Sequence, residues 1–138
     1  MGQLIKTVVH RIPEFCMTHW LLRIPLIVVF FQQGMNKWPI NIEDSPVELT
    51  LLVWSFVVLG ELGAAAGLLI GGMADYIKRT KEFGDVITRF SGITIASIMT
   101  GVIWTGEPES FTDVILYDNL HVLLWVGGMY FALRGNRT

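Results

Sequence analysis

The stretch LLVWSFVVLGELGAAAGLLIGG, residues 51–72, decides the fold expected for this chain. At about 1.5 Å of rise per helical residue it is long enough to cross the roughly 30 Å hydrocarbon core of a bilayer. Its only ionisable group is Glu61, which lies near the middle and is surrounded by glycine and alanine. An acidic side chain at mid-span costs about 2.5–3.5 kcal/mol on insertion scales. Glu61 is therefore expected to face other helices rather than lipid.

The composition agrees with a membrane protein, because 52% of the residues are hydrophobic and only 16% are charged, against roughly 25% charged in soluble domains. Apolar stretches recur at 18–35, 49–73, 86–104 and 114–133. We expect one all-α integral membrane domain covering 1–138, a four-helix bundle preceded by an N-terminal interfacial segment. The net charge of −2 and the absence of a basic patch exclude nucleic acid as a partner.

Two span boundaries carry local signals. Ser45 and Glu48 have the spacing of a capping box, which predicts that the second span begins there. The last span has two alternatives, which the sequence leaves open. A helix could begin at Phe111, or it could restart at Asp118 and Asn119 after a short interfacial turn.

The distribution of lysine and arginine predicts the direction of the spans. Basic residues gather before the first span, between the second and third, and after the fourth, whereas the other two loops are acidic. By the positive-inside rule both termini and the middle loop are cytoplasmic. The basic residues concerned are Lys6, Arg11, Lys78, Arg79, Lys81, Arg89, Arg134 and Arg137.

Small residues predict a helix contact on the second span. Gly63, Gly67 and Gly71 form a GxxxGxxxG pattern, and such patterns let helix backbones approach closely in membranes. Glu61 lies beside this glycine face at about 100° per residue. It is therefore expected to point into the bundle.

Two cations could compensate Glu61. Arg23 and Lys37 lie on one face of the first span, so the carboxylate is either ionised and paired with one of them or protonated. As an ion pair it would clamp two helices together. As a functional group it would form the polar end of a ligand pocket or a proton relay, the usual hypothesis for an ionisable residue inside a membrane.

His121 is the remaining candidate site residue. With Asp118 to orient its ring, it could donate a hydrogen bond to a quinone carbonyl or serve as an ordinary interfacial donor. Metal binding is not expected, because Glu61, Asp118 and His121 show no ligand spacing. The single Cys16 has no partner for a disulfide or a thiolate site.

Three parts of the chain resemble the DoxX family of small four-helix membrane proteins. They are the early arginine in LLRIPLIVVFFQQGMNKW (residues 21–38), GELGAAAGLLIGG (residues 60–72) and a glycine-bearing last helix. The resemblance covers roughly residues 18–134, and its positions are Arg23, Gly34, Lys37, Glu61 and Gly71. It implies a bacterial inner-membrane protein connected with redox chemistry, since the family includes a quinone-reactive subunit of thiosulfate oxidation and membrane partners of redox enzymes.

Two functions follow as expectations. The first is an accessory or assembly subunit that docks to a larger membrane redox complex or to itself, which the lack of any cysteine cluster, haem motif or nucleotide fingerprint favours. The alternative is a quinone-interacting subunit, as in a thiosulfate:quinone oxidoreductase, whose electrons come from a partner. No intrinsic cofactor is expected, and quinone is the candidate ligand. A transporter ranks third, because no inverted repeat is evident.

Overall fold

The computed structural model describes residues 1–138 except 12–18, 42, 44, 46–48 and 138. Within this described part every regular element is helical and no strand occurs, which confirms the all-α class. The elements are α1 (Gly2–Arg11), α2 (His19–Asn36), α3 (Leu51–Ala74), the short 3-10 helix η2 (Lys78–Thr80), α4 (Lys81–Thr105), α5 (Phe111–Tyr117) and α6 (Asn119–Arg134).

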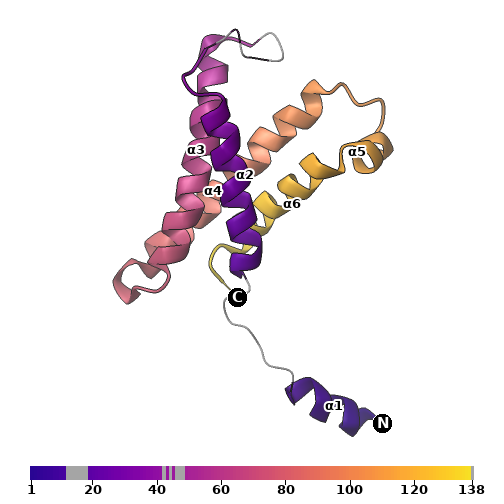
Figure 1. Ribbon diagram of the computed structural model, residues 1–138. Helices are drawn as coiled ribbons and strands as arrows, with labels where there is room; N and C mark the ends of the chain where they lie inside the picture. The colour runs from indigo at the N-terminus through magenta and orange to yellow at the C-terminus, as the bar shows by residue number, and fades with distance from the viewer. Residues whose placement is uncertain (12–18, 42, 44, 46–48, 138) are drawn as a thin grey trace.

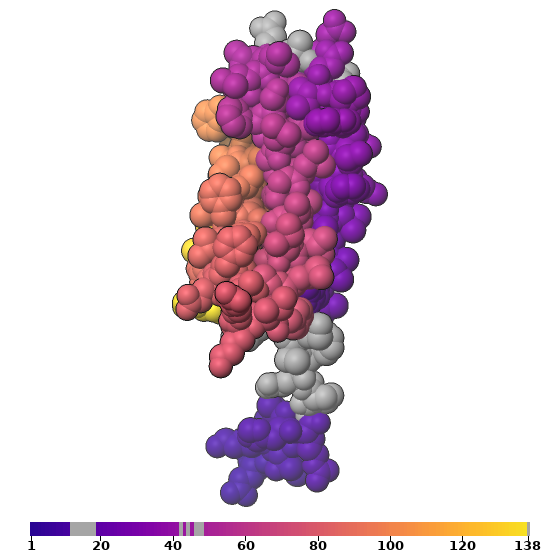
Figure 2. Space-filling model, turned by 90° about the vertical axis from the view of Figure 1, so that its left-hand side faces the viewer, coloured from indigo at the N-terminus to yellow at the C-terminus, as the bar shows by residue number. Residues whose placement is uncertain are grey.

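The four long helices pack in series. α2 packs on α3, α3 on α4 and α4 on α6, whereas α2 and α6 touch only slightly. In Figure 1 the α2–α3 pair and the α4–α6 pair diverge toward the end that carries the α2–α3 and α4–α5 connections, here called the open end. They converge toward the end that carries η2 and the segment after α6, here called the closed end. From another side, Figure 2 shows α3 between α2 and α4.

Two segments of the described chain are long and apolar enough to cross a membrane. They are α3 and the continuous stretch Lys78–Thr105, which contains η2 and α4. The bent pair α5–α6 makes a third candidate if it is one span. The long helices carry exposed apolar side chains such as Leu21, Phe56 and Phe90, as expected of helices that face lipid.

The start of α3 differs from the sequence prediction. The helix begins at Leu51, and Thr50 is its N-cap, with extended backbone and a hydroxyl that accepts a hydrogen bond from the Val53 amide. The expected capping box at Ser45 and Glu48 therefore does not start this helix, and its second member lies outside the described residues. A threonine hydroxyl can accept a hydrogen bond from the backbone amide three residues later and so cap a helix. Thr50 does this, which explains the later start.

The helix over the fourth apolar stretch, 114–133, is broken into α5 and α6. α5 begins after its N-cap Ser110 and ends at Tyr117, and α6 restarts at Asn119 at an angle of 98°. The break lies at Asp118, whose φ of −114° and ψ of 36° are not helical. Both starts that the sequence left open are therefore present.

The contact face of α3 is only partly the predicted one. A Cβ atom at Gly67 would collide with Ser91 of α4, and one at Gly71 would collide with Thr88. Gly63, in contrast, is exposed, and a Cβ there would meet nothing within 4 Å. A strict four-residue spacing rotates by about 40° per step around an α-helix, so Gly63 leaves the contact line. The observed line follows Gly60, Ala64, Gly67 and Gly71.

Replacing Gly67 with Leu should destabilise the protein by about 1–3 kcal/mol, because overpacking would force α3 away from α4. Gly63→Leu is the matched control and should leave stability nearly unchanged, since the side chain would enter open space. Thermal unfolding of the two variants in the same detergent measures the difference. Equal melting temperatures would show that α3 and α4 do not touch at Gly67.

Candidate functional site

The Lys37–Glu61 ion pair joins the end of α2 to the middle of α3. Lys37 Nζ lies 2.6 Å from Glu61 Oε1 and 2.7 Å from Oε2. The carboxylate side chain is 3% exposed and the ammonium side chain 22%, so the lysine is the partner that remains accessible. Its ammonium also lies 5.6 Å from the centre of the Trp54 ring, within the range of a cation–π contact.

Arg23 does not take part in this pair, because it is fully buried at the closed end and bonded elsewhere. Its Nη1 donates to Leu68 O at 2.6 Å and to Thr88 Oγ1 at 3.2 Å. Its Nη2 donates to Asn136 Oδ1 at 2.7 Å, and its Nε donates to His19 Nδ1 at 3.3 Å. Arg23 and Lys37 are separated by roughly 21 Å along the helix axis. Of the two cations that the sequence offered Glu61, the structure uses Lys37.

Asn136 connects the polar side chains of the closed end, and no role was predicted for it from the sequence. Its Oδ1 accepts from Arg23 and Thr88, and its Nδ2 donates to Gly71 O at 2.9 Å. Its backbone amide donates to Asp85 Oδ1 at 2.8 Å. The signal available in the sequence was the glycine after α6, Gly135, whose φ of 58° turns the chain back onto the bundle.

His121 lies in the first turn of α6 and is bonded to Asp118. Its Nδ1 lies 2.5 Å from Asp118 Oδ1, and both side chains are more than one-third exposed. The carboxylate comes from the residue that breaks the helix between α5 and α6. The expected orientation of the imidazole by Asp118 is therefore present at the open end.

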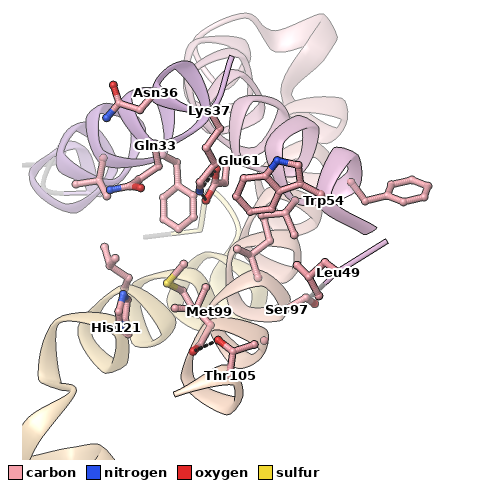
Figure 3. A pocket seen from close by; sticks show the side chains of 18 of the residues that line it. Gln33, Asn36, Lys37, Leu49, Trp54, Glu61, Ser97, Met99, Thr105 and His121 are labelled. Carbon is pink, nitrogen blue, oxygen red and sulfur yellow. Dashed lines mark hydrogen bonds and ion pairs between the residues drawn. The ribbon is translucent and has the colours of Figure 1, made fainter. Parts of the chain in front are cut away.

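A cavity of about 990 Å³ lies between the diverging helix pairs at the open end (Figure 3). Its lining comes from four helices and two residues beside them: α2 from Val29 to Asn36 with Lys37 after it, Leu49 before α3, α3 from Val53 to Glu61, α4 from Ser97 to Thr105, and α6 from Leu120 to Leu124. Lys37 and Glu61 lie against one another on one side, and His121 lies on the other. The structure thus brings three of the four predicted site residues to one cavity, and Arg23 is outside it.

The cavity walls are mostly apolar, with a few polar side chains. Phe30 and Met99 are buried where the cavity meets the packed core. Gln33 and Asn36 are exposed and lie one turn of α2 from Lys37 or closer. Apolar walls with a small number of polar groups are typical of sites for lipophilic ligands that carry a polar head. Helical spacing could have grouped these amides with Lys37, but the sequence prediction did not use them.

Comparisons of the chain with protein-family models, with curated proteins and with solved structures find no match.

Removing Lys37 should be more damaging than removing Glu61. Lys37→Gln leaves a carboxylate that cannot reach water, and an uncompensated buried charge costs about 3–5 kcal/mol. Glu61→Gln leaves an ammonium that is partly exposed and should cost less. The double variant should approach the stability of the parent protein, because neither charge remains. Unfolding free energies of the four proteins measure this coupling.

The control is the pair Glu61→Gln and Arg23→Gln, whose effects should add within about 0.5 kcal/mol because the two residues share no hydrogen-bond partner. Coupling of Glu61 to Arg23 rather than to Lys37 would contradict the geometry of this site.

Proposed function

We propose that this chain is a small multi-pass membrane protein that binds a quinone in the cavity at the open end and works as a subunit of a redox complex. The observation that carries the proposal is the meeting of Lys37, Glu61 and His121 in one largely apolar cavity. The DoxX resemblance supplies the redox context. The electrons come from a partner protein, and the cavity supplies the place where the quinone is held.

Four crossings are part of this proposal. The four crossing helices are α2, α3, α4 and α6. The short helix α5 lies at the membrane surface. α2 carries Arg23, but the guanidinium is bonded entirely inside the protein, so no charge from it faces lipid. Internal satisfaction of this kind is the condition under which a charged residue is tolerated in a span.

Quinone fits the chemistry of the cavity. A quinone ring is neutral and flat and has carbonyl oxygens at opposite edges, which accept hydrogen bonds but cannot donate them. The Lys37 ammonium has three N–H groups, and the Glu61 carboxylate accepts hydrogen bonds on one side of it. An N–H on the other side is available to a ligand. Lys37 and His121 face the cavity from opposite walls. The apolar side chains between them suit the ring and the start of its tail.

The assembly subunit, which the sequence alone favours, is the second candidate here, and a separate observation supports it. Two buried polar clusters fasten the helices, one around Lys37 and Glu61 and one around Arg23 and Asn136. In this function Glu61 is only a clamp, and the exposed apolar helix faces dock to a larger complex. Strong coupling of Lys37 and Glu61 in stability, together with no binding of quinone, would fit this alternative.

The proposed location is the bacterial inner membrane, with both termini and the α3–α4 connection in the cytoplasm. Single cysteines at Thr80 and Ser110, in a Cys16→Ser background, test this orientation. An impermeant thiol reagent added to intact cells should label the variant at Ser110 and not the one at Thr80, until the cells are lysed. Labelling at Thr80 in intact cells would reverse the orientation.

Quinone binding should depend on the cavity and not on the surface of α6. Leu124→Trp adds a large ring to the cavity lining, whereas Val126→Trp places the same ring on the exposed face of the same helix. We expect the first variant to lose at least tenfold in affinity for a short-chain benzoquinone and the second to bind like the parent protein. Titration of the protein in nanodiscs measures both. Equal binding by the two variants would place any quinone outside this cavity.

A further inference from the structure

The cavity is balanced in charge, although it contains ionisable groups. Its described lining includes Lys37, Glu61 and His121, and each of the two basic groups has its own acidic partner. Lys37 contacts both oxygens of Glu61, and His121 contacts Asp118 just beyond the lining. No cation of the described lining is therefore left for a negatively charged ligand.

This balance sets what the cavity can accept. An anionic head that approached Lys37 would meet the Glu61 carboxylate beside it, so one negative charge would remain uncompensated among apolar walls. Such a charge is costly away from water. A neutral head with an acceptor oxygen meets no such penalty, because it needs only an N–H of the exposed ammonium. Binding sites commonly obtain specificity by placing a charge that repels the wrong ligand.

We infer that the cavity selects uncharged lipophiles whose head accepts a hydrogen bond, and that Glu61 enforces this selection by masking the charge of Lys37. Fatty acids and anionic phospholipids are thereby excluded from the site. The inference rests on the proposed function in that it concerns the same cavity. It extends the role of Glu61 from a structural partner to the residue that determines specificity.

The geometry makes Glu61 the determinant rather than Lys37. The carboxylate is buried against the ammonium, while the lysine side chain stays partly exposed on the cavity side. Replacing the carboxylate with an amide keeps the size and a hydrogen-bond acceptor for Lys37. It removes the negative charge, so the ammonium becomes available to an anion. Glu61→Gln should therefore change which ligand is preferred, and not only how tightly ligands bind.

The test uses two probes that differ only in the head group, dodecanol and dodecanoate, at pH 9.5, because a bilayer raises the pKa of a carboxylic acid and the probe has to be ionised. Equilibrium binding of each radiolabelled probe is measured with the full-length protein in nanodiscs and corrected for empty nanodiscs. The parent protein should bind dodecanol at least tenfold more tightly than dodecanoate. Glu61→Gln should bind dodecanoate at least as tightly as dodecanol. Lys37→Gln with Glu61→Gln should lose the gain for dodecanoate, because no cation remains.

Leu124→Trp and Val126→Trp locate the binding in the cavity, since only the first should weaken binding of dodecanol. Equal binding of both probes by the parent protein, or unchanged preference in a folded Glu61→Gln variant, would overturn the inference. Binding of neither probe would overturn it as well. If dodecanol is preferred in the expected way but the benzoquinone does not bind, the selection by charge stands and the quinone function fails.

Discussion

The buried guanidinium of Arg23 is the interaction on which the arrangement of the helices depends. It reaches from α2 to the backbone of α3, to Thr88 of α4 and to Asn136, which follows α6. Removing any partner of a buried charge lowers the stability of the fold strongly, because the group left without a hydrogen bond cannot bond to water instead. The closed end is thus fixed at one point that all four long helices share.

Fixing the helices at one end leaves the other end free to separate. The short contacts of Gly71 and Gly67 with α4, and of Gly92 with α6, lie toward the closed end and in the middle of the bundle. Beyond them the helix pairs diverge, and the cavity occupies the space between them. The Lys37–Glu61 pair is the polar contact that holds α2 to α3 at the level of the cavity. The site is therefore a consequence of where the helices are fastened.

The helical class, three of the helix positions and the inward direction of Glu61 could be predicted from the sequence, because apolar length and one carboxylate in an apolar run are local signals. The identity of its partner could not, since Arg23 and Lys37 share one face of the first span, and which end of that face lies level with Glu61 depends on how α2 packs against α3. The break at Asp118 was one of two open alternatives. The role of Asn136 depends on the chain turning back after α6, which no periodic pattern predicts.

The position of Asn136 in the chain has a consequence for the order of assembly. It lies 113 residues after Arg23, so a ribosome completes α2 long before it adds the amide that accepts a hydrogen bond from this guanidinium. At about 5–20 residues per second the delay is roughly 6–23 s. During that time the guanidinium of Arg23 lacks this partner and has to be hydrated or bonded to other groups. The packing of α2 at the closed end can therefore be completed only after α6 and Asn136 have been synthesised.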